Sequence, residues 1–350
     1  MSGSQAIEPE RVPAGGRVLV TWIDYDPGGA RTGARLRAAG LRVDSAPKHG
    51  ARSAGEVARL AGGAVAAIVS TDPFDREVFA AAPRLRVIAR VGVGTDSIDL
   101  PAATEAGVAV MVTPGANTET AADHTVALVL AALRRLVEHD GSVRRGEWRR
   151  GGATMPWDLH GATVGLVGYG AIGRAVGRRL RGFGVELLVS DPAQLAGAGA
   201  GAAAGASAVA LPELLRRSDV VSLHLPLTPA TRGVIGEAQL ELMAPHAILV
   251  NTARGGLVDE PALARRLAAG RLRAAALDVF DDEPAVSPAL AALTNVVLSP
   301  HVGGLSERSV AAMTERATEH VLQALEGRLD PEALANPDVS ARFGAQMAMR

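Results

Sequence analysis

The sequence predicts an α/β protein built from two parallel-sheet domains. Strand-like and helix-like segments alternate along the chain, this alternation forms two successive series, and the chain has 350 residues. Domains usually contain roughly 100–200 residues, so a chain of this length accommodates two. Alternating strands and helices are typical of a parallel sheet with helices on both faces. We therefore expect two doubly wound sheets.

The first series begins after residues 1–16, which we expect to form a loose tail. Its strands are apolar runs, and its helices are bounded by glycine or proline, which favour turns between elements. We expect strands at residues 17–22, 64–70, 86–90 and 108–112, and helices at residues 30–40, 53–62 and 75–82.

One long helix is expected between the two series, over residues 117–139. Its middle is apolar, and Arg134 and Arg135 lie near its end, where positive charge favours the helix dipole. A basic loop follows at residues 141–152. The second series has expected strands at residues 163–167, 186–190, 220–225, 247–250, 274–278 and 296–298, and a final helix at residues 306–325.

The composition excludes several classes of protein and site. Apolar residues make up 48% of the chain and the net charge is -1, which favours a globular protein with no nucleic-acid or membrane partner. The absence of cysteine excludes disulfides, thiolate metal sites and a cysteine nucleophile. The N-terminus has no signal-peptide pattern, and the longest apolar run is too short to span a membrane. We expect a cytoplasmic protein without a metal site.

A glycine motif follows the first strand of the second series. Gly168, Gly170 and Gly173 form the pattern G-x-G-x-x-G between a strand and a helix. The first glycine permits a tight turn, the second lets the backbone approach a pyrophosphate, and the third allows close helix–strand packing. The phosphates would bind amides at the helix N-terminus, at Ala171 and Ile172. The motif therefore indicates dinucleotide binding.

Asp191 stands at the end of the next strand, and its spacing from the glycine motif suits an acid that binds ribose hydroxyls. A carboxylate repels a 2′-phosphate, and residues 192–194 contain no arginine that could bind one. The sequence therefore predicts NAD rather than NADP as the cofactor.

Three polar segments, residues 250–260, 277–284 and 298–304, follow strands of the second series. Each lies at the carboxyl edge of the sheet, where open α/β sheets bind ligands. The segments contribute an arginine, an acidic residue and a histidine. An arginine can bind a substrate carboxylate, a histidine can transfer the proton that accompanies hydride transfer, and a carboxylate can fix the histidine tautomer. Each residue alone would more often be structural, but together their types suit hydride transfer at a 2-hydroxy acid.

Over about residues 60–330, the sequence resembles the D-isomer-specific 2-hydroxyacid dehydrogenases, and most closely their phosphoglycerate dehydrogenase branch. The resemblance covers most of the chain and depends on several motifs together. These are residues 91–99, residues 113–117, the glycine motif, residues 251–255, residues 278–280 with 283–284, and residues 299–301.

The resemblance implies an NAD-dependent oxidoreductase whose catalytic trio is Arg254, Glu283 and His301. Asp281 and Asp282 are weaker alternatives to Glu283. The residues implied for ligand binding fall into three groups. The substrate carboxylate would bind Arg254 and the amides of Val91, Gly92, Val93 and Gly94; Thr252, Ala253, Asp278 and Gly304 would lie beside the nicotinamide; and His224 and Leu225 would lie near the adenosine.

The same resemblance implies a Rossmann NAD-binding domain inserted into a flavodoxin-like substrate-binding domain. The substrate-binding domain would comprise residues 1–112 and recover residues 303–330, with the NAD-binding domain at residues 113–302. Residues 331–350 would form a tail. The long helix would support a homodimer.

The particular 2-hydroxy acid stays open. Phosphoglycerate dehydrogenases often place a phosphate-binding arginine after the third strand, where this chain has Ser70, Thr71 and Asp72. The carboxylate of Asp72 would repel a phosphate, which puts 3-phosphoglycerate in doubt. The basic loop is an alternative source of positive charge for binding a phosphate, although clusters of charged residues are usually only solvated surface. Its arginines are Arg144, Arg145, Arg149 and Arg150.

Two further functions are compatible with the predicted fold. A dinucleotide-sensing, corepressor-like binding protein of the same fold can retain the trio, so these residues do not separate it from an enzyme. A formate dehydrogenase is disfavoured, because that branch typically has glutamine where Glu283 stands.

Overall fold

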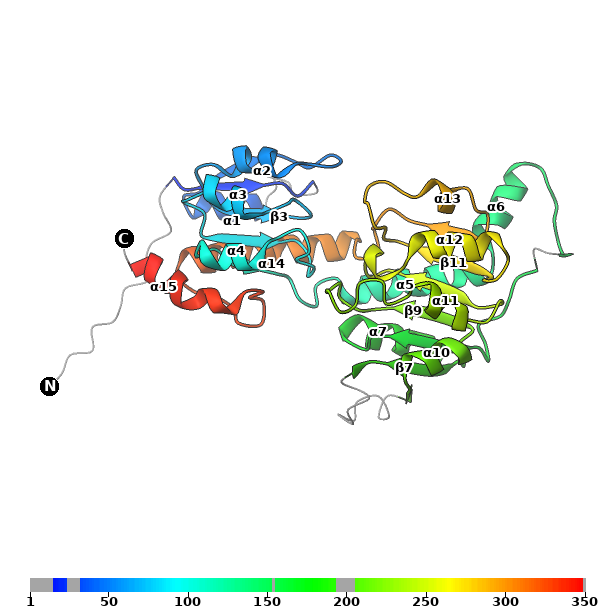
Figure 1. The fold of residues 1–350 in the computed structure, drawn as a ribbon. Coiled ribbons are helices and arrows are strands. Elements are labelled where there is room, and N and C mark those ends of the chain that lie inside the picture. The colour runs from blue at the N-terminus through cyan, green and yellow to red at the C-terminus, as the bar shows by residue number, and fades with distance from the viewer. Residues whose placement is uncertain (1–14, 24–31, 153–154, 193–204, 349–350) are drawn as a thin grey trace. The chain divides into compact units, whose positions relative to one another are not determined.

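The computed structural model describes residues 15–23, 32–152, 155–192 and 205–348. The chain divides into two compact units, of which the first comprises Met1–Asn117 with Ser306–Arg350 and the second Thr118–Leu305 (Figure 1). These boundaries lie a few residues beyond those expected from the sequence, after residues 112 and 302. The expected tail at residues 1–16 lies almost wholly outside the described residues.

The first unit contains a five-stranded parallel sheet of order β2-β1-β3-β4-β5. This is the strand order of a flavodoxin-like domain, as expected. Helices α1 and α14 pack on one face and α2, α3 and α4 on the other, so the central strand β3 is buried along its whole length. The elements are β1 Arg17–Val20, α1 Thr32–Ala38, β2 Arg42–Ser45, α2 Ala54–Ala61, β3 Ala64–Val69, α3 Arg76–Ala81, β4 Val87–Arg90, α4 Leu100–Glu105, β5 Ala109–Met111 and α14 Glu307–Leu325.

The chain after α14 is part of this unit, which corrects the expectation of a tail at residues 331–350. A short 3-10 helix, η4 Pro337–Val339, is followed by α15 Ser340–Ala348. Val339 and Phe343 are buried in the core of the first unit. The side chain of Asn336 accepts a hydrogen bond from the Val110 amide at 2.9 Å. Apolar burial and this bond fasten the segment to β5.

The second unit contains a seven-stranded parallel sheet of order β12-β11-β10-β9-β6-β7-β8. From β8 to β11 this is the strand order of a Rossmann domain, and β12 extends it. Helices α5 and α7 cover one face, and α10, α11 and α12 cover the other. The elements are α5 Thr118–Leu133, α6 Leu136–Arg144, β6 Thr163–Val167, α7 Ala171–Leu180, β7 Glu186–Ser190, β8 Ser207–Ala208, α10 Leu211–Arg217, β9 Val220–Leu223, α11 Glu237–Leu242, β10 Ile248–Asn251, α12 Glu260–Ala268, β11 Ala274–Leu277, α13 Pro288–Ala291 and β12 Val296–Leu298.

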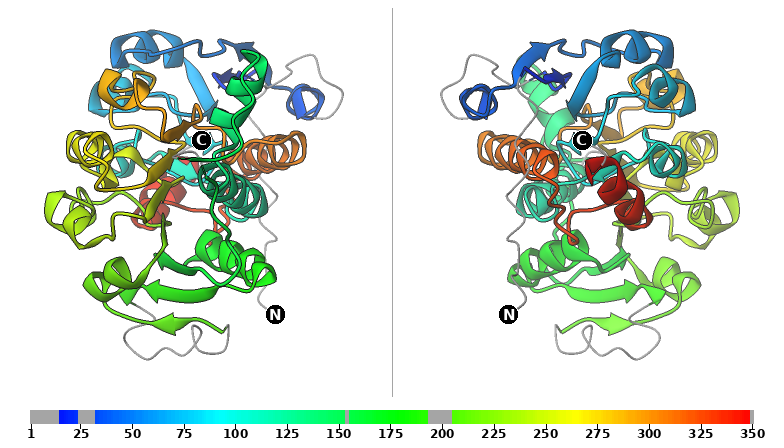
Figure 2. Two further views of the ribbon diagram at one scale, coloured as in Figure 1. Left: turned by 90° about the vertical axis from the view of Figure 1, so that its right-hand side faces the viewer. Right: turned by 90° about the vertical axis from the view of Figure 1, so that its left-hand side faces the viewer.

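The order of strands reverses between β6 and β9, because the chain moves outward from this pair in both directions. A crevice for ligands is expected at such a switch point, beyond the carboxyl ends of the strands. Strands β6 and β7, coloured green, lie side by side in both views of Figure 2. The glycine motif follows β6 directly, so the fold places it at this point.

Two expectations about local structure are wrong. The long helix expected at residues 117–139 breaks at Arg135, whose φ of 50° is left-handed, and the chain restarts as α6. Strand β2 was not expected, because it contains Arg42, Asp44 and Ser45 and its residues are at most half-buried. An edge strand that buries little apolar surface leaves little sequence signal.

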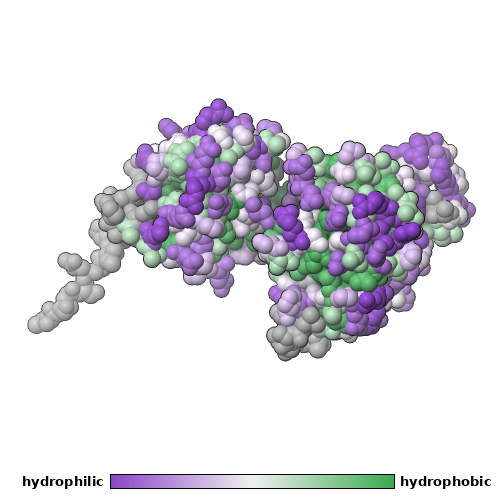
Figure 3. Space-filling view, viewed as in Figure 1, coloured by the Kyte–Doolittle hydropathy of each residue, from purple (hydrophilic) through white to green (hydrophobic). Residues whose placement is uncertain are grey.

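The face shown in Figure 3 carries hydrophilic side chains over both units, with apolar areas between them. Within the described residues, no helix has the length and apolar character needed to cross a membrane.

Candidate active site

The three residues of the proposed trio lie at one edge of the second unit's sheet. Arg254 follows β10, Glu283 follows β11 and His301 follows β12. These strands are parallel neighbours, so their carboxyl ends meet at the same edge. The three polar segments identified in the sequence are therefore brought together by the order of the sheet.

Glu283 and His301 form a direct pair. Nδ1 of His301 lies 2.7 Å from Oε2 of Glu283, and the two side chains are 37% and 33% exposed, in the order His301 then Glu283. Partial burial favours a higher pKa for Glu283, but contact with His301, the Phe280 amide and the charge of Arg254 lower its pKa below the ordinary value. The carboxylate is therefore ionised around neutral pH. Asp281 and Asp282 are exposed and make no described contact with His301.

The backbone of His301 is in the left-handed region, with a φ of 54°. This conformation is uncommon for residues other than glycine and persists only where surrounding contacts hold it. The His301 amide donates to the carbonyl of Asp278 at 2.7 Å. The amides of Val302 and Gly303 donate to the Asp278 carboxylate at 3.0 and 2.7 Å.

Asp278 is 1% exposed, and Ser299 donates to its Oδ1 at 2.6 Å. Its burial favours a higher pKa, yet the hydrogen bonds from His124, Ser299, Gly303 and Val302 lower the pKa of this carboxyl. The sequence suggested a place for Asp278 beside the nicotinamide. In the structure its carboxylate holds the segment that carries His301.

Arg254 follows β10 in an extended conformation, and its Nη1 donates to the Ala253 carbonyl at 2.6 Å. The side chain of Asn251 donates to the Arg254 carbonyl at 2.8 Å and accepts from the Ala253 amide at 3.0 Å. A Cβ on Gly255 would lie 2.0 Å from the Phe280 carbonyl carbon. Only glycine therefore lets the loops after β10 and β11 approach this closely.

The glycine loop has the form that a dinucleotide site needs. Gly168 has a φ of 92°, and a Cβ there would lie 2.8 Å from the His224 carbonyl oxygen. A Cβ on Gly173 would lie 2.5 Å from the Gly168 carbonyl oxygen, whereas Gly170 has open space beside it. The first and third glycines thus allow close packing, and the second leaves an approach to the backbone.

Helix α7 begins at Ala171 and continues through Ile172, so their amides lie at the helix N-terminus as expected. Oδ2 of Asp191 accepts a hydrogen bond from the Tyr169 amide at 2.8 Å, which ties the end of β7 to the glycine loop. His224 and Leu225 follow β9 across the switch point. These are the residues expected from the sequence to hold the adenosine and pyrophosphate parts of NAD.

The first unit contains the loop expected to bind the substrate carboxylate, and two of its amides are already used. The Val91 amide donates to Val69 at 2.8 Å, and the Gly92 amide donates to the Thr113 hydroxyl at 2.9 Å. Within the described residues, no acceptor meets the amides of Val93 and Gly94. Of the four amides that were expected to bind the substrate carboxylate, those of Val93 and Gly94 therefore remain as candidates.

Asp72 does not present a free charge after β3, contrary to expectation. Its side chain is fully buried, pairs with Nη1 of Arg52 at 2.9 Å and accepts from the Thr21 hydroxyl at 2.5 Å. Compensation by Arg52 removes the repulsion that the sequence suggested for a phosphate. Nζ of Lys48 donates to the carbonyl and hydroxyl of Thr71, both at 2.9 Å.

Three of the four arginines of the basic loop have acidic partners nearby. Arg144 pairs with Asp140 at 2.7 Å, and Arg145 and Arg149 contact Glu147 at 3.3 and 2.9 Å. These contacts favour the interpretation of the loop as solvated surface over that of a phosphate site.

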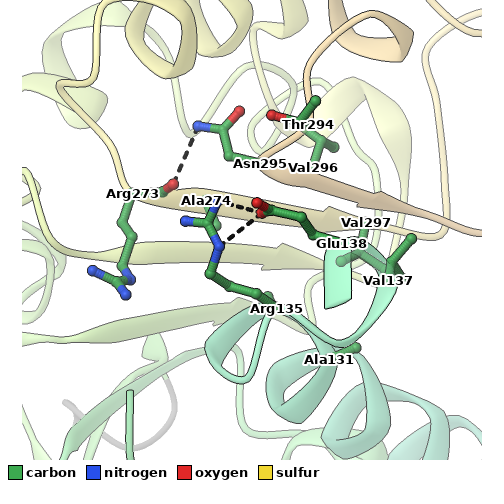
Figure 4. Close-up of a pocket in the computed structure, with 11 residues that line it drawn as sticks. Ala131, Arg135, Val137, Glu138, Arg273, Ala274, Thr294, Asn295, Val296 and Val297 are labelled. Atoms are coloured by element: carbon green, nitrogen blue, oxygen red, sulfur yellow. Dashed lines mark hydrogen bonds and ion pairs between the residues drawn. The ribbon is translucent and has the colours of Figure 1, made fainter. Parts of the chain in front are cut away.

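A separate pocket lies at the opposite, amino-terminal edge of the sheet (Figure 4). Arg273 and Asn295, which precede β11 and β12, line it together with the ion pair between Arg135 and Glu138. Its position separates it from the trio.

Several residues of the active-site edge were not identified from the sequence. Nε2 of His124 lies 3.1 Å from the Ser299 hydroxyl, and the hydroxyls of Thr125 and Thr252 are 2.8 Å apart. Glu260 accepts from the Asp281 amide at 2.7 Å. Residues 124–125 end the polar first half of α5, so the sequence does not set them apart from the other polar residues of this helix.

Comparison with known proteins agrees with this geometry. The family described as "D-isomer specific 2-hydroxyacid dehydrogenase, NAD binding domain" matches residues 126–303. A glyoxylate reductase of Korarchaeum cryptofilum is 45% identical over 274 residues, which cover 77% of this chain and 81% of that protein. A D-3-phosphoglycerate dehydrogenase of Mycobacterium leprae is 42% identical over 269 residues, which cover 76% of this chain and 50% of that protein. The crystal structure of the TT0316 protein from Thermus thermophilus superimposes with a TM-score of 0.79 at 40% identity, covering 90% of this chain and 98% of that one.

Proposed function

Because the chain belongs to the D-isomer specific 2-hydroxyacid dehydrogenase family, an NAD-binding family, we propose that it reduces a small 2-keto acid to the D-2-hydroxy acid. We assign the chemistry to Arg254, Glu283 and His301. The observation that carries this assignment is the 2.7 Å contact between Glu283 and His301 at the carboxyl edge of the sheet.

NADH supplies the hydride in this proposal, and the residues of the chain bind the acid and move the proton. The Arg254 guanidinium binds the substrate carboxylate and polarises the ketone oxygen. His301 donates its Nε2 proton to that oxygen as negative charge develops there. Glu283 holds Nδ1 and stabilises the imidazolium. The amides of Val93 and Gly94 are donors for the substrate carboxylate.

Thr252, Ala253, Asp278 and Gly304 lie near the trio in the chain and keep their proposed place beside the nicotinamide. Gly168, Gly170, Ala171, Ile172 and Gly173 would hold the pyrophosphate. Asp191, with His224 and Leu225, would hold the adenosine part.

The substrate class that we favour is a 2-keto acid without a charged side chain, such as glyoxylate. The relative with 45% identity is named a glyoxylate reductase. In this chain Ser70 and Thr71 follow β3 without an arginine, and Arg52 is engaged with Asp72. The second candidate is the 3-phosphoglycerate pair, favoured by the ammonium of Lys48 beside Thr71.

The test is a panel of 2-keto acids assayed with NADH by the loss of its absorbance. Glyoxylate, hydroxypyruvate and pyruvate represent the uncharged side chains, and phosphohydroxypyruvate represents the phosphate. We expect the highest kcat/KM with an uncharged member. A preference for phosphohydroxypyruvate that is lost in Lys48→Met would support the second candidate. NADH binding without turnover of any acid would favour a dinucleotide-sensing binding protein.

We also propose that the protein is a homodimer and that α6 and the segment after it contribute to the interface. Five of the ten exposed large apolar side chains of the described chain lie between residues 136 and 155. Exposed apolar side chains gathered in one segment are typical of an interaction surface. They are Leu136, Val137, Val143, Trp148 and Met155.

Light scattering after size exclusion tests the dimer. We expect twice the chain mass for the wild type and a shift toward monomer for Val137→Asp combined with Trp148→Ser. A monomeric wild type at micromolar concentration would contradict this proposal without affecting the proposed reaction.

A further inference from the structure

Helix α5 reaches the active-site edge through two consecutive residues. The helix packs against β10, β11 and β12, the three strands that precede the trio. The hydroxyl of Thr125 lies 2.8 Å from that of Thr252, just after β10. Nε2 of His124 lies 3.1 Å from the Ser299 hydroxyl, after β12, and 3.3 Å from Oδ1 of Asp278, after β11.

The hydrogen bonds around Asp278 have a consistent direction. The ionised carboxylate can only accept, so the Ser299 hydroxyl donates its proton to Oδ1 across 2.6 Å. The Ser299 oxygen is then an acceptor for His124, which requires that Nε2 of His124 carries a proton. The contact of this same Nε2 with Oδ1 is also a donor contact. One ring nitrogen thus binds both partners.

No lysine or arginine neutralises Asp278 within the described residues. A carboxylate that is 1% exposed is costly to bury unless it is fully hydrogen-bonded. Its donors are the Ser299 hydroxyl, the Val302 and Gly303 amides and His124. His124 is therefore the basic side chain on which this buried charge depends.

The space around Gly303 shows how closely these groups pack. A Cβ there would lie 2.7 Å from Oδ2 of Asp278 and 3.2 Å from Cδ2 of His124. The carboxylate and the imidazole thus lie directly against the backbone two residues after His301. The left-handed His301 is held on both sides, by Ser299 before it and by Val302 and Gly303 after it.

We infer that His124 is a positioning residue, which orients Ser299 and Asp278 and through them holds His301 in its left-handed conformation. This inference rests on the proposed function of His301. It goes beyond that function by giving a role in the reaction to a residue that touches neither NADH nor the substrate in our proposal. In this role His124 affects the geometry of proton transfer. Its removal should therefore lower kcat more than it weakens the binding of NADH or the keto acid.

The test compares His124→Leu, which lacks the donor, with His124→Gln, whose amide can donate from a similar position. We expect His124→Leu to lower kcat about tenfold, with KM for the keto acid and Kd for NADH within about twofold of wild type. His124→Gln should recover most of this loss. The kcat–KM split and the recovery are effects that a purely structural residue would not produce.

His246→Phe is the matched control. His246 also contacts an aspartate in this unit, with Nε2 3.0 Å from Oδ1 of Asp219, but it precedes β10 at the opposite edge. We expect this variant to keep the kcat of wild type. If His124→Leu fails to fold, Ser299→Ala breaks the same link with a smaller side chain and should give the same selective fall in kcat.

Two results would overturn the inference. One is a wild-type kcat in His124→Leu or, in its place, Ser299→Ala. The other is an equal loss in His124→Gln and His124→Leu. Failure of the proposed function can be distinguished from failure of this inference. The first would show as unchanged turnover in His301→Ala, whereas the second alone leaves the roughly 100-fold fall in kcat of His301→Ala in place.

Discussion

Nδ1 of His301 faces Oε2 of Glu283 across 2.7 Å, and this contact determines which ring nitrogen is left for a substrate. The carboxylate accepts from Nδ1–H, so Nε2 is the nitrogen that our proposal assigns to proton exchange with the substrate. Because Glu283 follows β11 and His301 follows β12, the parallel pairing of these strands sets the relation between the two side chains.

The first prediction concerns the charge of Glu283. Its pKa is lowered below the ordinary value, so the carboxylate is charged throughout the neutral range. Glu283→Gln keeps the size and removes the charge, which makes the imidazolium of the pair less favourable. We expect kcat to fall roughly 10- to 100-fold. In reduction, the fall in rate at high pH should move to lower pH; in oxidation, the rise in rate should begin at lower pH.

Both shifts have the same sign because one group is protonated for reduction and neutral for oxidation. The measurement is a pair of pH–rate profiles in each direction, under conditions where the chemical step limits the rate. Unmoved profiles would show that Glu283 does not act on His301, and Asp281 and Asp282 would be tested next.

The second prediction concerns cofactor choice. Asp191 would face a 2′-phosphate with like charge, so we expect kcat/KM for NADH to exceed that for NADPH at least about tenfold, or about 1.4 kcal/mol. Asp191→Asn keeps an acceptor for the Tyr169 amide and removes the charge. This variant should lower the ratio of kcat/KM for NADH to kcat/KM for NADPH. Equal use of both cofactors by the wild type would contradict the role given to Asp191.

The sequence predicted the parts of this molecule whose signal is local. Strand β3 is an unbroken apolar run, and it is buried on both faces. The glycine motif and the three polar segments each follow a strand of the second sheet, so the carboxyl edge of that parallel sheet brings them together. For this reason the pairing of Glu283 with His301 could be predicted from the sequence.

The features that were not predicted depend on partners distant in the sequence. The carboxylate of Asp72 was expected to repel a ligand, because nothing near it in the chain shows that Arg52 neutralises it. His124 gave no sign of a role, because Asp278 and Ser299 lie much further along the chain. Residues 331–350 were expected to form a tail, and only the fold shows that Phe343 is buried.

The third prediction concerns the buried pair of Arg52 and Asp72. Arg52→Met leaves the fully buried carboxylate without its cation, and we expect a loss of about 3–5 kcal/mol in the free energy of unfolding. The double variant Arg52→Met with Asp72→Asn removes both charges and should be more stable than the single one. Urea unfolding of the three proteins measures this. Equal stability of the single and double variants would argue against a buried charge as the cause.

The fourth prediction concerns His224 and acid. Burial lowers the pKa of His224 to about 4 from the ordinary 6.5, because its Nε2 is inaccessible and meets no hydrogen-bond partner among the described residues. Between these values the unfolded chain binds more protons than the folded one. The contribution of neutral His224 to the free energy of unfolding is therefore fully present above about pH 6.5, and it declines as the pH falls toward about 4.

His224→Gln removes this titration and should flatten the decline. The measurement is the urea midpoint of wild type and variant at pH values above and within this interval. The same fall in both proteins would assign the acid sensitivity to other groups.

The central claim is that His301 transfers a proton during reduction of a 2-keto acid by NADH. The most direct measurement is the steady-state rate of NADH loss with the preferred acid of the panel, compared between wild type and His301→Ala, with NADH binding followed separately by fluorescence. We predict that kcat falls roughly 100-fold or more while Kd for NADH stays near the wild-type value. Unchanged turnover in His301→Ala would contradict the account.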